Sequence, residues 1–257
     1  MDFRLNWIGF ITIVRKEVIR VARIWIQTIV PPAITMTLYF IIFGNLIGSR
    51  IGPMSGFDYM QYIAPGLIMM SVITNSYGNV VSSFFGAKFG KHVEEMIISP
   101  MSNATIILGH IVGGVARGLM VGLLVTLVAL TFADLSVIYP FITFSIIIFA
   151  SIVFALLGFL NAIFAKKFDD IAIVPTFILT PLTYLGGVFY SISLLPDFWQ
   201  KVSLVNPILY MVNAFRYGIL GTSDINIIWA YFIIIFFVIL LFTLNFVLLN
   251  RGYGIRK

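Results

Sequence analysis

Residue types suited to catalysis are few in this sequence, and most of them lie outside its long apolar stretches. All ten acidic residues fall outside these stretches, whereas Arg117 lies inside one. A proton-coupled transporter needs a carboxylate or histidine at membrane depth, and arginine does not deprotonate in proteins. The adjacent acids Asp169 and Asp170 suit Mg²⁺ chemistry on a lipid pyrophosphate, but their place in a short loop is more typical of a helix start. With two histidines and no cysteine, we expect no metal site.

One motif resembles a phosphate-binding loop and departs from it in spacing. That loop needs four residues between its glycines and Ser or Thr after its lysine. Here three residues separate Gly86 from Gly90, and His92 follows Lys91. We therefore expect no cofactor in this chain, and any ATP and Mg²⁺ that drive it should bind a separate ATPase.

The composition indicates a membrane protein. Apolar residues make up 60% of the 257 residues and charged residues 10%, an apolar share larger than a soluble domain of this length can bury. The net charge of +6 comes from short clusters of Lys and Arg between apolar runs, without a single basic patch. This pattern favours contact with a membrane surface over contact with nucleic acid.

Six apolar stretches are long enough to span a bilayer, which takes about 20 helical residues. They cover 24–47, 62–84, 104–132, 139–164, 171–190 and 227–249. Neither a linker nor an internal repeat divides the chain, so we expect one all-α integral membrane domain over 1–257.

The Lys and Arg residues predict the orientation of these spans. Twelve lie in one alternate set of segments, which comprises both ends of the chain and the intervals 85–103 and 165–170. The other set holds three: Arg50, Lys201 and Arg216. Because basic residues favour the cytoplasmic side, both termini are predicted to be cytoplasmic.

The segment 1–23 is predicted to form an amphipathic helix at the membrane. Polar residues recur along one stripe (Thr12, Arg15, Lys16, Arg20, Arg23) and apolar residues along another (Trp7, Phe10, Ile11, Val14, Val18, Val21). Polar residues interrupt each apolar run, so a cleavable signal peptide is not expected. Two placements stay open: in the interface plane, or docked on protein.

The interval 85–103 predicts a short amphipathic helix over 86–100, which Pro100 ends. Its apolar residues lie on one face: Phe89, Val93, Met96 and Ile97. Its charged residues lie elsewhere on the helix: Lys88, Lys91, Glu94 and Glu95. Such a helix can couple the spans to a soluble partner by filling a groove on it. The alternative is a plain surface connector.

The interval 191–226 is too apolar for a solvated loop, yet no uninterrupted stretch in it reaches 18 residues. Short helices that enter and leave one leaflet fit this pattern, which predicts an outer re-entrant helical hairpin. Pro196 and Pro207 suit the first turns of such helices. Trp199, Tyr210 and Tyr217 suit the membrane interface.

Arg117 lies about 20 Å into the third stretch, at 1.5 Å per residue. An unpaired charge there costs about 2.5–3.5 kcal/mol on insertion scales, so it should face protein or water. Two roles stay open: contact with an anionic cargo, or pairing with polar groups of neighbouring helices. Tyr184 and Tyr190 are candidates for the same pathway, although aromatic residues in spans more often pack or anchor.

Glycines around Arg117 predict close helix packing. Gly114, Gly118 and Gly122 recur at every fourth residue, and Gly109 with Gly113 forms a second pair. Small residues at this spacing let helix backbones approach closely.

The fifth stretch and the outer interval resemble the signature of type-2 ABC exporter permeases. The matching residues are Leu179, Leu182, Leu185, Gly186, Val188, Leu195, Pro196, Pro207, Ile208, Leu209, Tyr210 and Arg216. Others resemble the YadH-type branch of that family: Trp25, Gln27, Pro31, Pro32, Phe43–Asn45, Ala64–Leu67 and Phe168–Asp170. The resemblance covers essentially the whole chain. It implies six spans, an N-terminal interface helix, a coupling helix, an outer hairpin, and two permeases paired with two ATPase subunits.

We therefore predict a non-enzymatic permease subunit of an ATP-driven ABC exporter in a bacterial cytoplasmic membrane. It would work as a homodimer in contact with lipids and move an amphipathic, lipid-like, glycan or drug cargo. One alternative is a lipid-modifying membrane enzyme, against which the lack of a membrane-facing acid, His or Cys constellation argues. The other is a non-transporting scaffold, which would not need a coupling helix.

Overall fold

Helices dominate the structure, a computed structural model that describes residues 3–254 and leaves the side chains of 45–47 and 49 outside the description. The first half holds α1 (Phe3–Arg23), α2 (Trp25–Tyr39), the π-helix η1 (Phe40–Ile47), α3 (Gly48–Ile51), α4 (Tyr59–Phe89), α5 (His92–Ile98) and α6 (Asn103–Ala129). The second half holds α7 (Pro140–Phe164), α8 (Asp170–Val174), the π-helix η2 (Pro175–Leu179), α9 (Thr180–Tyr184), the 3₁₀-helix η3 (Ile192–Leu194), α10 (Asp197–Leu204), α11 (Pro207–Leu220) and α12 (Ile227–Asn250). The described residues form no β-strand. The all-α prediction is confirmed.

Four helical segments of the described chain are both long and apolar enough to cross a membrane. They run over Trp25–Gly44, Asn103–Ala129, Pro140–Phe164 and Ile227–Asn250. These correspond to the first, third, fourth and sixth stretches predicted from the sequence. The 15-residue helical segment Asp170–Tyr184 is apolar but shorter.

Helix α4 lies at the centre of the bundle and packs along α6, α7 and α11. It is 31 residues long, and most of its side chains are buried. Because protein surrounds it, it can carry polar side chains such as Ser71, Ser76, Asn79 and Ser83, all of them buried. This polarity explains why α4 is less apolar than the helices at the periphery.

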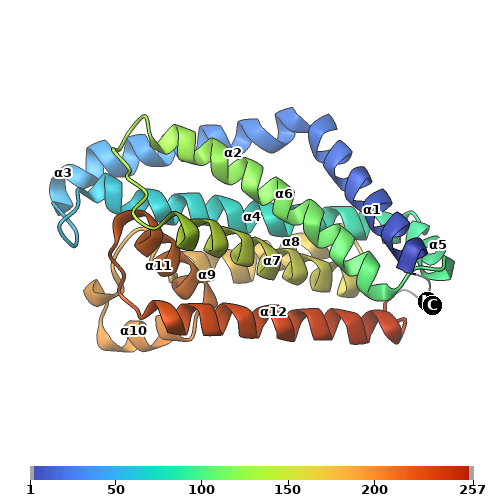
Figure 1. Ribbon diagram of the computed structural model, residues 1–257. Coiled ribbons are helices and arrows are strands. Elements are labelled where there is room, and N and C mark those ends of the chain that lie inside the picture. The colour runs from blue at the N-terminus through green and yellow to red at the C-terminus, as the bar shows by residue number, and fades with distance from the viewer. Residues whose placement is uncertain (1–2, 255–257) are drawn as a thin grey trace.

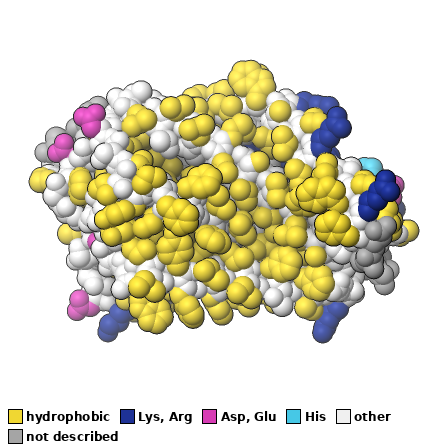
Figure 2. Space-filling model, viewed as in Figure 1, with side chains coloured by type: hydrophobic (Ala, Val, Ile, Leu, Met, Phe, Trp, Pro, Cys, Tyr) yellow, Lys and Arg dark blue, Asp and Glu magenta, His cyan; other side chains and the backbone are white. Residues whose placement is uncertain are grey.

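The two ends of the bundle differ in structure and charge. Figure 1 shows α5 and the described ends of α1 and α12 at one end, with α3, α10 and α11 at the other. In Figure 2, apolar side chains cover the middle of the visible face, and most visible Lys and Arg gather at the α5 end. Arg256 and Lys257, which enter the sequence-based orientation, lie outside the described residues.

Two predicted spans differ from the observed helices because a glycine ends the helix at another position. The first helical segment runs past residue 47 to Ile51, because η1 and α3 continue it until Gly52, whose φ of +78° ends the helix. The segment predicted at 171–190 is helical only to Tyr184, because the chain turns at Gly187, where φ is +69°.

The predicted helix over 86–100 divides into two. Residues 86–89 are the last turn of α4, and α5 begins only at His92. Lys91 adopts the left-handed conformation, with a φ of +63°, which breaks the helix between them. The segment after α4 is therefore a separate seven-residue helix.

Helix α1 packs against α6 where two glycines remove side-chain bulk. A Cβ at Gly109 would lie 2.7 Å from Ile13 Cγ2, and one at Gly113 would lie 2.6 Å from Glu17 Cβ. On the other side of α1, Trp7, Ile8 and Ile11 are exposed. One face of α1 is thus docked on protein and another presents apolar side chains outward.

Candidate functional site

The α5 end of the bundle exposes both apolar and acidic side chains. Phe89 is 64% exposed and Ile98 is 85% exposed, which is unusual for such large apolar residues at a polar end of a bundle. Glu94, Glu95 and Lys91 are exposed as well. Glu95 lies 4.0 Å from His92, an exposed pair that contributes little to stability. This surface can be occupied by a partner without breaking the fold.

The apolar residues of this segment do not share one outward face, contrary to the sequence prediction. Val93 is buried, and Met96 and Ile97 pack on the core. Phe89 instead lies beside Phe168, with ring centroids 5.0 Å apart. The inward residues hold α5 against the bundle, so the outward apolar surface comes from Phe89, Ile98 and the half-exposed Phe168 of the 165–170 loop.

Lys88 has an internal role that the sequence did not reveal. Its Nζ donates to the carbonyl oxygens of Ile163 at 2.6 Å, Ala165 at 2.7 Å and Ala162 at 3.3 Å. These carbonyls belong to the C-terminal turn of α7, which lacks intrahelical partners and favours a positive charge. Lys88 therefore ties the end of α4 to the end of α7 and is not free to bind a partner.

The Asp169–Asp170 pair forms a helix start. Asp170 Oδ2 accepts hydrogen bonds from the backbone N–H groups of Lys166 at 2.7 Å and Lys167 at 3.0 Å. These backbone hydrogen bonds hold the pKa of the Asp170 carboxyl below its usual value. No cluster of three or more His, Cys, Asp or Glu suited to a metal ion occurs among the residues that the structure describes.

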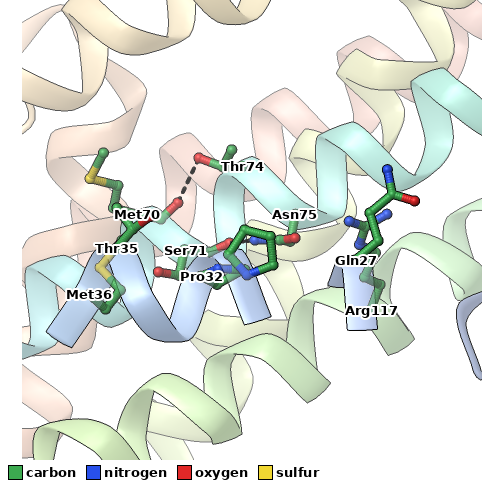
Figure 3. Close-up of a pocket in the computed structure, with 10 residues that line it drawn as sticks. Gln27, Pro32, Thr35, Met36, Met70, Ser71, Thr74, Asn75 and Arg117 are labelled. Atoms are coloured by element: carbon green, nitrogen blue, oxygen red, sulfur yellow. Dashed lines mark hydrogen bonds between the residues drawn. The ribbon is translucent and has the colours of Figure 1, made fainter. Parts of the chain in front are cut away.

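Arg117 lines a cleft of about 310 Å³ between α2, α4 and α6. The other lining residues mix polar and apolar types: Gln27, Pro31, Pro32, Thr35, Met36, Met70, Ser71, Thr74 and Asn75. Figure 3 shows that α2 and α4 supply these residues on one side and α6 supplies Arg117 on the other. Arg117 Nε is buried and has no hydrogen-bond partner among the described residues. The Arg117 side chain therefore borders open space in the cleft, and its Nε has no acceptor among the described residues.

Tyr184 and Tyr190 lie outside the set that lines this cleft. Tyr190 donates its hydroxyl to the carbonyl oxygen of Tyr184 at 2.8 Å. The Tyr184 ring stacks on Phe189 at 5.8 Å, and Phe189 also contacts Tyr39 of α2 at 5.7 Å. The two tyrosines therefore belong to an aromatic cluster that joins the turn after α9 to α2.

The glycines at every fourth position of α6 lie against α4 and α7. A Cβ at Gly114 would lie 2.7 Å from Val80 Cγ2 and 2.9 Å from Ala155 Cβ. One at Gly122 would lie 2.7 Å from Val72 Cγ2, and one at Gly118 would meet the Ser76 hydroxyl. Close helix approach thus depends on the absence of side chains here.

We expect Gly118→Ala to lower the free energy of unfolding by about 1–2 kcal/mol, the lower part of the range for overpacking, because the Ser76 hydroxyl can rotate away. Gly78→Ala on α4 is the matched control, since a Cβ at Gly78 meets nothing within 4 Å. Thermal unfolding of both variants in detergent is the measurement. Equal stability of the two variants would contradict the packing role of Gly118.

Arg216 is fully buried at the opposite end of the bundle and joins three segments. Its Nη2 donates to the carbonyl oxygen of Gly187 at 2.6 Å, and its Nε to that of Tyr62 at 3.2 Å. The guanidinium also lies over the Tyr62 ring, 4.1 Å from its centroid. Asp224 completes this cluster by accepting from Ser191 Oγ at 2.8 Å. The cluster holds α11, the turn at Gly187 and the start of α4 together.

The other signature residues shape the two short helices of the outer interval. Pro196 directly precedes α10, and Pro207 is the first residue of α11. The backbone carbonyl of Leu195 accepts from Gln200 Nε2 at 2.8 Å, and Tyr210 donates its hydroxyl to Leu204 at 2.8 Å. These contacts are local, so the signature describes the geometry of this segment.

Glu17 is the centre of a buried polar cluster that the sequence analysis missed. It is fully buried, accepts from Ser83 Oγ at 2.5 Å, and lies 3.0 Å from Arg20 Nη2 and 3.2 Å from Lys16 Nζ. His110 Nε2 lies 4.0 Å away. The four-residue spacing of Glu17 from the buried Ile13 and Val21 places all three on one stripe, and this spacing is the pattern from which the cluster could have been found.

Opposing effects act on the Glu17 carboxyl. Burial alone would raise its pKa, but His110, the Arg20 guanidinium, the Ser83 hydroxyl and the Lys16 ammonium together hold the pKa below its usual value. Arg20 is itself fixed by Asn79, whose Oδ1 accepts from Nη2 at 2.7 Å. Glu17 is therefore ionised at neutral pH and fastens α1 to α4.

Comparison with known proteins identifies the family of this chain. The family model described as "ABC-2 type transporter" matches residues 9–220. The chain belongs to the ABC-2 type transporter family. This ABC-2 chain is 55% identical over 254 residues to the "Inner membrane transport permease YadH" of Escherichia coli K12, which covers 98% of this chain and 99% of that protein. It is 24% identical to "Nodulation protein J" of Sinorhizobium fredii over 80% of this chain and 79% of that protein.

The family membership confirms the resemblance found in the sequence, including its YadH-type branch. It also confirms that this ABC-2 chain is a transporter component and not an enzyme. The match ends at residue 220, so α12 lies outside the matched range.

Proposed function

We propose that this chain is the permease subunit of an ATP-driven ABC exporter in a bacterial cytoplasmic membrane. The observation that carries this proposal is the surface around α5, where Phe89 and Ile98 are exposed beside the carboxylates of Glu94 and Glu95. A soluble ATPase can bind such a surface through an apolar centre and a charged rim. The E. coli relative is named an inner membrane transport permease, which supports the same location.

The proposed topology has six spans with both termini in the cytoplasm. The four membrane-length apolar segments supply four spans, α4 supplies one inside the bundle, and α8, η2 and α9 supply a short one. The helices α10 and α11 then form a hairpin that returns to the outer side. The concentration of Lys and Arg at the α5 end supports a cytoplasmic location for that end.

In the proposed assembly, two copies of this chain pair with two ATPase subunits that bind ATP and Mg²⁺. Closure of the ATPase dimer would push on α5, and this force would pass to α4 through the short turn at Gly90 and Lys91. Lys88 supports this route because it ties the adjoining turn of α4 to α7. The cargo would move between the two copies or from the bilayer.

The experiment that tests coupling is the double variant Glu94→Gln and Glu95→Gln. We expect a loss of affinity for the ATPase of roughly three- to tenfold, because each exposed charge pair is worth about 0.2–1 kcal/mol. The measurement is the amount of ABC ATPase that copurifies with the tagged permease, together with the ATP hydrolysis rate of the complex. Asp134→Asn with Asp197→Asn is the matched control, since both residues are exposed and lie away from α5. An unchanged complex and unchanged hydrolysis in the α5 variant would reject the proposed coupling surface.

A further inference from the structure

The cleft at Arg117 has the composition of a site for an anionic group. Arg117 lies at the fifteenth position of the 27-residue helix α6, which is close to the middle of a spanning helix. A cation at this depth is costly unless protein acceptors, an anion or water satisfies it. Arg20, which carries a charge of the same sign, acts electrostatically on Arg117 and does not neutralise it.

No described acid forms an ion pair with Arg117. The buried acid Glu17 is already engaged by Arg20, Lys16 and Ser83. The positive charge is therefore available to a ligand.

A second unpartnered polar group lines the same cleft. Ser71 is 2% exposed, and its Oγ has no hydrogen-bond partner among the described residues. A buried hydroxyl without a partner costs free energy, as does the buried Arg117 Nε. Both residues line the same cleft, and both side chains can donate hydrogen bonds, which an oxyanion would accept.

The walls of the cleft indicate the rest of the ligand. Pro31, Pro32, Met36 and Met70 give apolar surface next to the donors. Along α2, the neighbouring Ile34 and Leu38 are 56% and 52% exposed, so an apolar surface continues beyond the cleft. A polar head held at Arg117 would thus have an apolar path beside it for a chain.

We propose that this cleft binds the anionic head, a phosphate or carboxylate, of an amphiphilic cargo whose apolar tail lies along α2. This inference rests on the proposed function, because it names the chemical class of the exported cargo. Arg117 and Ser71 donate to the head, and the remaining polar lining comes from Gln27 and Thr35 of α2 and from Thr74 and Asn75 of α4.

The test is photo-labelling of the purified permease in nanodiscs with a diazirine-bearing phosphatidylglycerol. We expect cross-links in the peptides that contain residues 27–36 and 70–75. Arg117→Gln should lower this labelling roughly tenfold, the size expected from losing a charged hydrogen bond. Arg117→Lys, which keeps the charge, should retain part of it. Arg251→Gln is the matched control, because it removes an exposed charge at the end of α12.

Competition experiments distinguish the class of ligand. Unlabelled phosphatidylglycerol should compete, whereas phosphatidylcholine should not. Equal competition by inorganic phosphate would overturn the assignment to an amphiphile, and labelling that is unchanged in Arg117→Gln would overturn the site.

A second variant keeps the test decisive if Arg117→Gln does not fold. Thr35 is exposed on α2, so Thr35→Trp should fill the cleft without disturbing the core, and it should lower labelling as well. Undiminished labelling in a folded Thr35→Trp protein would reject the cleft. The labelling experiment needs no ATPase. It can therefore fail while the coupling experiment succeeds, and it can succeed while the coupling experiment fails.

Discussion

Replacing Arg216 by methionine is expected to lower the free energy of unfolding by about 3–5 kcal/mol, the cost of removing one partner from a buried charged network. Methionine has a similar length but donates no hydrogen bond. The carbonyl oxygens of Gly187 and Tyr62 would lose their donors in a fully buried site. Each unsatisfied acceptor adds to the loss, as does the cation–π contact with Tyr62.

The measurement is thermal or denaturant-induced unfolding of detergent-purified protein, with the yield of folded monodisperse protein as a second readout. Arg216→Lys is expected to be intermediate, because an ammonium keeps the charge but cannot reproduce the planar guanidinium fork. Arg251→Met is the control, since it makes the same chemical change at an exposed position. If Arg216→Met and Arg251→Met unfold alike, Arg216 does not hold the outer segments together.

Replacing Glu17 by leucine is expected to release α1 from the bundle at a cost of about 3 kcal/mol, within the range for losing hydrogen-bonded charges in a buried site. The variant leaves Ser83 without its acceptor and Arg20 without its nearby carboxylate. Arg20 would then keep only its bonds to Asn79. Asn6, near the start of α1, also accepts hydrogen bonds from Ser102 and Thr105, so we expect the attachment around Glu17 to weaken before that of the first turns.

Limited trypsin digestion measures this release directly, because α1 contains Arg15, Lys16, Arg20 and Arg23. We expect faster cleavage in α1 of Glu17→Leu, with the rest of the bundle still resistant. Thr12→Leu is the matched control on an exposed position of the same helix. Identical cleavage rates in the two variants would show that Glu17 does not fasten α1.

The attachment of α1 should also depend on pH. The pKa of Glu17 is lower in the folded protein than its ordinary value, so ionised Glu17 stabilises the folded state. Its contribution is complete above the ordinary pKa and is lost as the pH falls through the folded-state pKa. Trypsin-independent probes, such as a fluorophore on α1, should report no change from pH 8 to pH 6 and release only under acid conditions. Release near neutral pH would contradict this assignment.

The long apolar helices were predictable because their stabilising solvent is the bilayer. Helices α6, α7 and α12 are long uninterrupted apolar segments, so their bounds agree with the sequence to within three residues. The segment after α8 was predicted less well, because its end is set by a glycine turn at Gly187 and not by a change in hydropathy.

The sequence singled out residues of the candidate sites, but it did not predict which groups those residues contact. The sequence singled out Arg117 from its depth, yet the cleft and the unpartnered Ser71 depend on how α2 and α4 pack beside α6. It grouped Lys88 with the residues that face a partner, because the carbonyls that Lys88 binds come from α7, some 75 residues later. Long-range contacts of this kind leave no periodic pattern.

Hydropathy, charge distribution and family motifs are properties of the linear sequence, and they were enough to identify a helical membrane transporter component. Which polar residues have partners became visible in the packed helices. Ser83 of α4 donates to Glu17, and the distant carbonyls of Gly187 and Tyr62 accept from Arg216, whereas Arg117 is left with an open cleft. The reason is physical: the cost of a buried charge depends on what surrounds it in space, and that is fixed only when the helices pack.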